Sequence, residues 1–384
     1  MKALRISGLI FIFTICISMV AAAQENALVH HVSGRVPVTG VGRELAAERP
    51  FVAPAAGAEV KTRPDGNTWT ELATLNFAVV HDISFATPLI GYAAAEAGEV
   101  WKTTDGGKTW TEVLNLSYPY YFYGVHALNA KTVVISGFYD SQTFEGLIRW
   151  SHDGGKTWSS DIDLSSTGWV QRVRFQKKNG LIMDLIGGQE NTAQYTTDGG
   201  AGASDWSTVI SDPDGGWFQL EFSFLPNLHA RATGIDFCQS LNAGAQWSCG
   251  PAVDQVFDGE VFFLNNDKNG WDAGGEISPN VEGWVHVTTN GGNTWSGRTL
   301  DGPWPIREVL FLNAKTGWAA GGNIYTGVGG IYFSNDGGNT WTLDVNTGAE
   351  MDACDTKPVK GSHQVWCVGY DSSFNAHVYT TTVK

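Results

Sequence analysis

Aromatic side chains and carboxylates occur together in several segments that are predicted to be loops. The densest group is the run from Tyr118 to Tyr123, which reads Y-P-Y-Y-F-Y, and Tyr139 is followed directly by Asp140. Aromatic faces stack on the CH faces of sugars and on apolar side chains, while carboxylates accept hydrogen bonds from hydroxyl and amide groups. We therefore predict a ligand-binding surface made of Tyr118, Tyr120, Tyr121, Tyr123, Tyr139, Asp140, Trp169, Trp217 and Trp304.

A second set of acidic and amide side chains belongs to a repeated motif, S/T-x-D/N-x-G-x-T-W. Residues 103–110 read T-T-D-G-G-K-T-W, and residues 334–341 read S-N-D-G-G-N-T-W. Glycine can supply the positive φ of a tight turn, and Asp or Asn can accept hydrogen bonds from the amides of that turn. The motif therefore predicts a tight turn between two strands, with the Trp ring packed beneath it.

The tryptophans that close these motifs recur at intervals of 41, 48, 48, 41, 48 and 46 residues. A period in this range, with about four short strands per unit, predicts the blades of a β-propeller. Short β-branched and aromatic runs between Gly-rich turns support strands throughout, and no helical periodicity is evident. The closing residues are Trp69, Trp110, Trp158, Trp206, Trp247, Trp295 and Trp341.

The two ends of the chain predict how the propeller closes. After the last motif the sequence offers three further strands, near residues 351–354, 365–369 and 377–381, and it ends where another motif should begin. The missing fourth strand is what residues 65–72 would provide. We therefore predict an all-β fold for residues 60–384: a single seven-bladed propeller of four-stranded blades, closed by pairing of the N- and C-terminal strands.

The repeated acids favour a structural role over a catalytic one. Equivalent groups spread round a ring cannot share one substrate, whereas each can accept the hydrogen bonds of its own turn. We predict this structural role for Asp105, Asp153, Asp198, Asn242, Asn290 and Asp336.

A different polar position lies next to the predicted central channel. One residue before the apolar pair of several first strands is charged and can face the channel entrance. These residues are Asp82, Arg172, Glu260 and Glu308, with Arg307 adjacent.

The repeated motif resembles the Asp-box, or BNR, repeat over nearly the whole chain after Val60. The wider order of I/V-x-F, then G-W-A-x-G, then T-x-D-G-G-x-T-W resembles the photosystem II stability and assembly factor family, and residues 309–341 match it best. That resemblance implies a lumenal, seven-bladed protein that acts by holding a partner. Sialidase and sortilin-type propellers are more distantly similar, but the F-R-I-P of sialidases is absent and only Ile306-Arg307 is present.

No catalytic constellation is identified. Ser-His-Asp, Walker and H-E-x-x-H patterns are absent, and nothing in the spacing selects His81, His126 or Tyr123 as a base. We predict an exported binding or scaffold protein for a protein or glycan ligand, with no cofactor and no metal. The alternative is a glycoside hydrolase or polysaccharide lyase that uses rim carboxylates or a His/Tyr base.

Residues 1–23 are typical of a secretory signal peptide. Lys2 and Arg5 precede an apolar run over residues 6–20, and three alanines give an A-x-A cleavage site. The run is too short for a comfortable membrane span, so no stable membrane insertion is expected. Residues 24–59 carry no motif and are predicted to be an arm or linker. We expect the mature protein to be secreted, periplasmic or lumenal.

The charge and the cysteines agree with this expectation. The net charge of −15 becomes −17 when Lys2 and Arg5 are removed, which disfavours nucleic acid and favours cationic or uncharged partners. We predict a monomer. Four cysteines remain after the signal, and in an exported protein they predict two cross-strand disulfides, Cys238 with Cys249 and Cys354 with Cys367.

Overall fold

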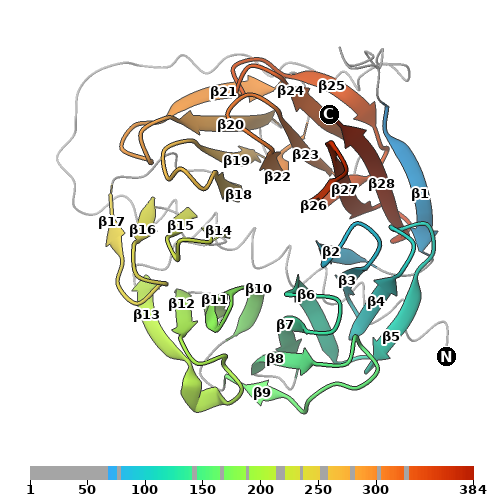
Figure 1. Cartoon of the computed structure of the whole chain (residues 1–384), viewed down its shortest axis with the longest axis vertical. Coiled ribbons are helices and arrows are strands. Elements are labelled where there is room, and N and C mark those ends of the chain that lie inside the picture. Colours follow the sequence, from blue (N-terminus) through green and yellow to red (C-terminus); the bar gives the residue numbers. More distant parts are fainter. Residues whose placement is uncertain are drawn as a thin grey trace, which may run out of the picture. The chain divides into compact units, whose positions relative to one another are not determined.

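The computed structural model describes residues 68–75, 79–140, 145–164, 168–186, 190–212, 221–233, 237–250, 258–276, 282–300, 304–323 and 328–384. These residues form seven four-stranded antiparallel sheets that follow one another round a central axis (Figure 1). The predicted seven-bladed all-β propeller is therefore confirmed. The described residues contain a short 3-10 helix, Ala203–Asp205, and none of their helices is long and apolar enough to cross a membrane. The predicted signal peptide and arm lie outside the described residues.

Each blade runs from an inner strand beside the axis to an outer strand at the edge of the ring (Figure 1). Blade 1 consists of β2 (Val80–Phe85), β3 (Gly91–Ala95), β4 (Glu99–Thr103) and β5 (Thr111–Asn115). Blade 2 consists of β6 (Tyr120–Ala127), β7 (Val133–Tyr139), β8 (Glu145–Ser151) and β9 (Ile162–Asp163). Blade 3 consists of β10 (Trp169–Gln176), β11 (Asn179–Ile186), β12 (Glu190–Thr196) and β13 (Ser207–Asp212). Blade 4 consists of β14 (Glu221–Phe224), β15 (Ala230–Thr233), β16 (Cys238–Ser240) and β17 (Ser248–Cys249).

The remaining blades follow the same order, except that the last one takes its outer strand from the start of the chain. Blade 5 consists of β18 (Asp258–Phe263), β19 (Gly270–Glu276), β20 (Glu282–Thr288) and β21 (Ser296–Leu300). Blade 6 consists of β22 (Ile306–Phe311), β23 (Gly317–Asn323), β24 (Val328–Ser334) and β25 (Thr342–Asn346). Blade 7 consists of β26 (Glu350–Val359), β27 (Ser362–Tyr370), β28 (Ala376–Val383) and β1 (Thr70–Leu75).

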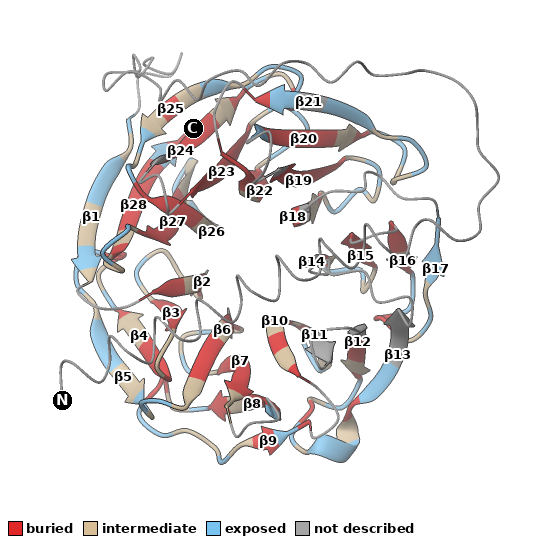
Figure 2. Cartoon of the chain, turned by 180° about the vertical axis from the view of Figure 1, so that it is seen from behind, coloured by how far each residue is buried: buried red, intermediate tan, exposed pale blue. Residues whose placement is uncertain are grey.

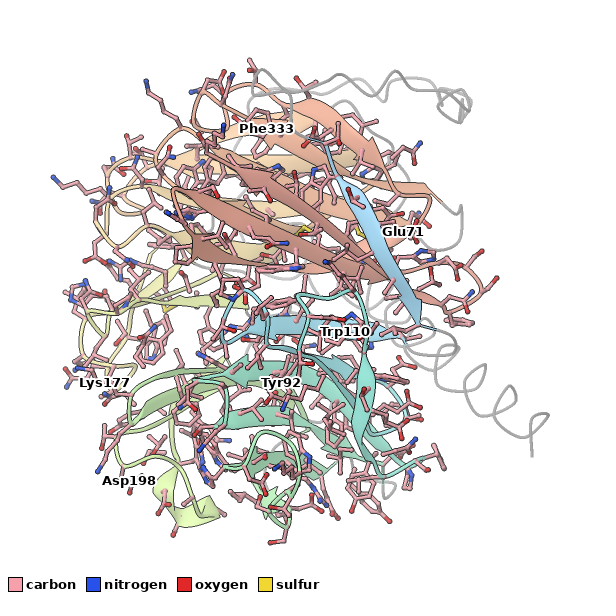
Figure 3. The ribbon with its side chains drawn as sticks, turned by 45° about the vertical axis from the view of Figure 1, so that its right-hand side comes forward. Glu71, Tyr92, Trp110, Lys177, Asp198 and Phe333 are labelled. Carbon is pink, nitrogen blue, oxygen red and sulfur yellow. A yellow bond between two sulfur atoms is a disulfide. The ribbon has the colours of Figure 1, made fainter. Side chains whose placement is uncertain are left out.

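Pairing of the two chain ends closes the ring, as the sequence predicts. β1 is antiparallel to β28, with Thr70 opposite Thr380 and Leu75 opposite Ala376. Glu71 of β1 (Figure 3) also bonds to His377 Nδ1 of β28 at 2.7 Å. No blade is therefore left with a missing outer strand, and the ring has no free inter-blade edge.

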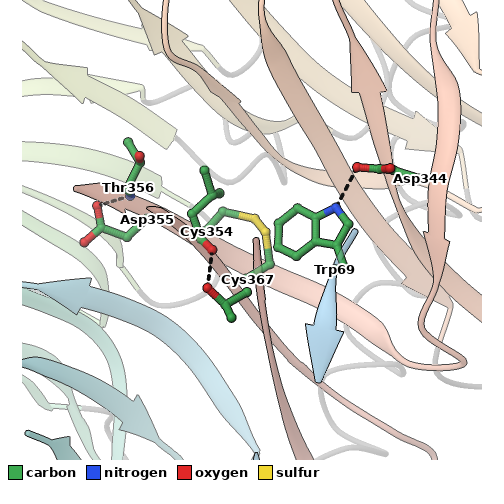
Figure 4. The surroundings of a disulfide bond; sticks show 8 residues. Trp69, Asp344, Cys354, Asp355, Thr356 and Cys367 are labelled. Carbon is green, nitrogen blue, oxygen red and sulfur yellow. Dashed lines mark hydrogen bonds between the residues drawn. A yellow bond between two sulfur atoms is a disulfide. The ribbon is translucent and has the colours of Figure 1, made fainter. Parts of the chain in front are cut away.

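The N-terminal strand is also bonded to the blade before it. Trp69 Nε1 donates to Asp344 Oδ2 at 2.7 Å (Figure 4), and the Trp69 ring packs edge-on against Trp318 of blade 6 at 6.3 Å. Thr381 Oγ1 donates to the Thr68 carbonyl at 3.0 Å. Residues 68–75 are thus held by both blade 6 and blade 7.

Aromatic stacking between neighbouring blades explains the I/V-x-F and G-W-A patterns. The Phe at the end of an inner strand stacks on the second-strand Trp of the preceding blade: Phe85 on Trp366 at 3.8 Å and Phe311 on Trp271 at 3.6 Å. All four rings are almost completely buried. Burial is concentrated on the inner and middle strands, while the outer strands are largely exposed (Figure 2). Each stacked pair adds about 0.5–1.5 kcal/mol beyond the burial of its area.

The repeated motif forms the predicted turn between the third and fourth strands. Asp105 Oδ1 accepts from the Thr109 amide at 2.9 Å and Oδ2 from the Thr109 hydroxyl at 2.7 Å, while Thr103 Oγ1 accepts from the Gly107 amide at 2.9 Å. Gly106 and Gly107 have φ of 81° and 95°. Hydrogen bonds from Thr109 lower the pKa of Asp105 to about 2. Asp153, Asn242, Asn290 and Asp336 accept from their own turns in the same way.

Each turn is also tied to its neighbours. Trp110 Nε1 donates to the carbonyl of Gly107 at 2.9 Å, so this Trp ring does lie against its own turn. Trp366 Nε1 of blade 7 donates to the Gly106 carbonyl of blade 1 at 2.9 Å, and Trp271 of blade 5 does the same to Gly337 of blade 6. We call the side of the ring that carries these turns the turn rim. The opposite side, which carries residues 116–119, 140 and 304–305, is the loop rim.

Side chains on the inner strands link adjacent blades across the ring. Ser84 Oγ accepts from the Ala127 amide at 3.0 Å, His126 Nδ1 from the Phe175 amide at 3.0 Å, and Ser223 Oγ from the Phe263 amide at 3.2 Å. Burial, together with the charges of Arg174 and Lys357, lowers the pKa of His126 to about 3. His126 is therefore a neutral hydrogen-bond acceptor within the fold.

Both predicted disulfides are present. Cys238 and Cys249 face each other on β16 and β17, and Cys354 and Cys367 face each other on β26 and β27, the latter pair shown in Figure 4. In each pair the Cα atoms are 4.1 Å apart. The first disulfide holds the two-residue outer strand of blade 4, and the second joins the inner and second strands of the closing blade.

Candidate functional site

The inner strands, except β14 among those described, share an irregularity near the loop rim. In β2, β6, β10, β18, β22 and β26 the pairing register with the second strand shifts, which is the mark of a β-bulge. A bulge inserts an extra residue and re-aims its side chain. The residues at the shifts are His81, Tyr123, Gln171, Gly259, Arg307 and Asp352.

These bulged residues surround a pocket at the centre of the ring. The pocket has a volume of about 170 Å³. Every bulged residue lines it, so the same distortion, repeated in blade after blade, builds a single site. Its lining is completed by Arg172, Glu350 and Tyr370.

The His81 side chain is held as a cation on one wall of the pocket. Its Nδ1 lies 3.3 Å from Asp352 Oδ2 and its Nε2 lies 3.2 Å from Glu96 Oε1, so both ring nitrogens face carboxylates. Burial opposes the charged form, but the hydrogen bonds with Asp352 and Glu96 raise the pKa of His81 to about 9. The ring stacks on Tyr123 at 4.3 Å and meets the edge of Tyr370 at 6.0 Å.

A buried charge network lies behind the second wall. Asp82 is 1% exposed and accepts from the Val125 amide at 2.9 Å and from Arg174 Nη1 at 2.9 Å. Arg172 reaches Asp82 at 3.2 Å and Glu260 at 3.8 Å. Burial would raise the pKa of Asp82, but the two arginines hold it below its usual value. The network fixes Arg172, whose side chain also faces the pocket.

The third wall comes from blades 6 and 7. Arg307 Nε donates to Glu350 Oε1 at 2.9 Å. Burial raises the pKa of Tyr370 well above 10, and the neighbouring Asp352 and Glu350 raise it further. Burial and the nearby Glu260 likewise raise the pKa of Glu308. The Tyr370 hydroxyl therefore stays neutral at ordinary pH.

A series of aromatic rings connects this pocket to the exposed loop rim of blade 2. Tyr118 is 61% exposed and meets Tyr121 edge-on at 6.2 Å, and Tyr121 stacks on Phe138 at 4.8 Å. Phe138 stacks on Trp169 at 5.2 Å and on Tyr123 at 5.9 Å, and Tyr123 in turn stacks on His81. We call this series, from Tyr118 through Tyr121, Phe138, Trp169 and Tyr123 to His81, the aromatic ladder.

The predicted ligand-binding residues fall into different environments. Tyr118, Tyr123, Tyr139, Asp140 and Trp169 are exposed or half-buried on the loop rim. Tyr120 is half-buried, donates to Asp161 at 3.1 Å and lies under the Arg149 guanidinium.

Two of the predicted rings are buried and one cannot be placed. Tyr121 is 3% exposed within the ladder, and Trp304 is 2% exposed in the core of blades 5 and 6, beside Tyr332. Trp217 lies outside the described residues. The structure thus gathers Tyr118, Tyr121, Tyr123 and Trp169 into one ladder and leaves Trp304 in the packing between blades.

The predicted channel residues are shifted by one position from the pocket surface. Asp82, Glu260 and Glu308 are buried behind the lining, and the bulged residues before them face the pocket instead; Arg172 does both. The sequence analysis did not select Gln171, Gly259, Glu350, Asp352 or Tyr370, and it noted His81 and Tyr123 only as an unselected base. The usable signal is the residue directly before each charged first-strand position.

Comparison with known proteins supports the fold. No protein-family model matches the sequence, and no curated protein is similar to it in sequence. YCF48 from Cyanidioschyzon merolae superposes with a TM-score of 0.58 at 19% identity, over 82% of this chain and 98% of that chain. A structure of YCF48 bound to D1 peptide gives a TM-score of 0.58 at 17% identity, over 83% and 97% of the two chains. The WD40 β-propeller domain of Doa1 gives 0.58 at 11% identity, over 82% and 97%.

These similarities define the protein as a seven-bladed propeller with the architecture of YCF48 and of WD40 domains. Identities below 20% concern the fold only. What the loop rim binds must be argued from the pocket and the ladder.

Proposed function

We propose that this protein is a binding scaffold that holds an extended segment of a partner protein on its loop rim. The observation that carries the proposal is the continuity of the aromatic ladder with the central pocket, from the exposed Tyr118 to His81 and Tyr370. Rigid aromatic side chains supply large contact areas at low entropic cost, and a pocket can fix the register of one side chain. A structural neighbour, YCF48, has been solved with a bound peptide, which supports this mode of binding.

Export is part of the proposal. Two disulfides in a chain with a predicted signal peptide fit an oxidising compartment such as a periplasm, a lumen or the extracellular space. The photosystem II assembly factor resemblance of the repeat pattern favours the same kind of compartment. Within this proposal the residues of the repeated turns are structural, because their side chains bond to their own turns on the opposite rim.

A glycan is the second candidate ligand. The observation that favours it is local: the exposed Tyr118 ring lies beside Asp140, to which its hydroxyl is hydrogen-bonded. A ring next to a carboxylate suits a sugar face and its hydroxyls. Glycan cleavage would need a general acid and a second carboxylate across the scissile bond. Incubation with a polysaccharide panel, assayed for new reducing ends or unsaturated products, tests that alternative.

A peptide-display selection tests the leading proposal. The mature chain is immobilised, random twelve-residue peptides are selected on it, and the survivors are measured by calorimetry on wild type and on the Tyr123→Ala variant. We expect selected peptides to lose at least about tenfold in affinity on Tyr123→Ala, because the ring joins the ladder to the pocket. Failure to select any peptide, or affinities that ignore the substitution, would contradict the proposal.

A further inference from the structure

We infer that the central pocket receives the cationic side chain, lysine or arginine, of the protein segment bound on the loop rim. This inference rests on the proposed function and adds the chemistry of the residue that fills the pocket. It is argued from the balance of charge around the pocket, from the partners that each lining cation already has, and from the size of the cavity.

Carboxyl groups outnumber cationic groups among the described residues that line the pocket or bond directly to its lining. The cations are His81, Arg172, Arg174 and Arg307. The carboxyl groups are Asp82, Glu96, Glu260, Glu308, Glu350 and Asp352. Even with Glu308 protonated, one carboxylate is left in excess, and the whole chain carries a net charge of −15 that adds to the negative field.

Each lining cation is already matched by acids. His81 bonds to two carboxylates, Arg172 reaches Asp82 and Glu260, and Arg307 bonds to Glu350. An anionic group that entered the pocket would have to displace one of these pairs, and breaking a buried pair leaves an uncompensated charge. An anionic ligand is therefore disfavoured, even though three of the lining residues are basic.

A cation finds acceptors without breaking those pairs. Asp352 meets His81 through Oδ2, so its second oxygen is directed elsewhere, and Glu350 meets Arg307 through Oε1. The neutral Tyr370 hydroxyl adds an acceptor oxygen on the same side of the pocket. An ammonium or guanidinium between Glu350, Asp352 and Tyr370 would complete the charge balance.

The size of the pocket fits a single side chain. Its volume is about 170 Å³. A dry cavity of about 150 Å³ is enough to hold benzene, so the pocket can take the aliphatic stem and head group of lysine or arginine. The remainder of the segment would then lie across Tyr123 and Trp169 toward Tyr118.

A substitution scan of a selected peptide tests the inference. Each position of the peptide is replaced in turn by lysine, arginine, norleucine and glutamate, with blocked ends so that only side chains carry charge. We expect one position at which lysine or arginine binds about tenfold tighter than norleucine, and glutamate weaker still. The comparison of lysine with arginine identifies the head group.

Variants of the protein assign that preference to the pocket. Asp352→Asn should reduce the ratio between the lysine and norleucine peptides to near one, while Asp140→Asn, on the loop rim but outside the pocket lining, should leave it unchanged. Glu350→Gln is the second variant, for use if Asp352→Asn does not fold by circular dichroism. If peptides bind but prefer glutamate, or if neither pocket variant changes the ratio, the inference is wrong while the proposed function stands. If no peptide binds the wild type, the proposed function itself fails.

Discussion

His81 and Tyr123 stack face to face at 4.3 Å, with their planes 14° apart, although they belong to inner strands of different blades. Both are the extra residue of a β-bulge. Without the bulges the alternation of the strands would direct these side chains elsewhere, because side chains on a regular strand alternate between its two faces. The stacking of this pair is the point at which the pocket and the aromatic ladder meet.

The His81 cation should make stability depend on pH. Its pKa is raised from 6.5 in the unfolded chain to about 9 in the folded one, so its contribution is fully present below about pH 6.5 and is lost as pH rises through 9. The difference corresponds to at most about 3 kcal/mol. Urea unfolding of wild type between pH 6 and pH 10 should show this decline.

The matching control is His81→Gln, which keeps a polar side chain but does not titrate. This variant should lack the part of the decline that belongs to His81, whose facing groups are Glu96, Asp352, Tyr123 and Tyr370. Equal slopes for the two proteins would show that His81 does not bind its proton more tightly in the folded state.

The repeated turn acids should matter for stability and not for binding. Asp336→Ala removes an acceptor for Ser334 Oγ, for the Thr340 amide and for the Thr340 hydroxyl, and should cost about 1–2 kcal/mol of unfolding free energy. Asp336→Asn should cost less, because Asn290 makes the equivalent bonds in blade 5. A stable Asp336→Ala protein that no longer binds its peptide would contradict the structural role.

Closure of the ring should depend on the C-terminal strand. A chain that ends at Asn375 lacks β28, which pairs with both β27 and β1, and should fail to give a cooperative unfolding transition. Removal of Lys384 alone, an exposed residue beyond the end of β28, is the control and should leave the melting temperature unchanged. A folded protein without residues 376–384 would show that closure does not need this strand.

Trp69 offers a finer probe of the same closure. Trp69→Phe keeps an aromatic ring against Trp318 but removes the Nε1 donor to Asp344. Because Asp344 is 5% exposed, loss of its partner should cost about 1–3 kcal/mol. The double variant with Asp344→Leu should regain part of that loss, and a full additive loss would argue against a direct coupling.

The sequence was sufficient for the architecture because the repeat is carried by local chemistry. The glycines with positive φ, the turn acid and the closing Trp act within eight residues, so their spacing alone marks each blade. Closure could be predicted because the strand missing after Thr381 is the one that residues 70–75 supply. The disulfides could be predicted because cysteines on adjacent strands of one blade face each other.

The site could be predicted only in part, because a β-bulge depends on pairing with a partner strand. Nothing in the residues near His81 or Asp352 states that the register shifts there, so the charged residue one place later was taken for the channel surface. Trp304 and Tyr121 have loop or strand-start positions like that of Tyr118, yet both are buried. Whether such a ring is covered depends on the neighbouring blade, which local sequence does not describe.

Photo-cross-linking of a selected peptide is the most direct test of the central claim. A peptide that carries a diazirine residue is irradiated with the mature chain, and the linked sites are mapped by mass spectrometry. The account predicts links to residues 118–123, 169–172 and 350–352 and to Tyr370, all on the loop rim or in the pocket. Links confined to the turn rim, at residues 103–110 or 334–341, would contradict it.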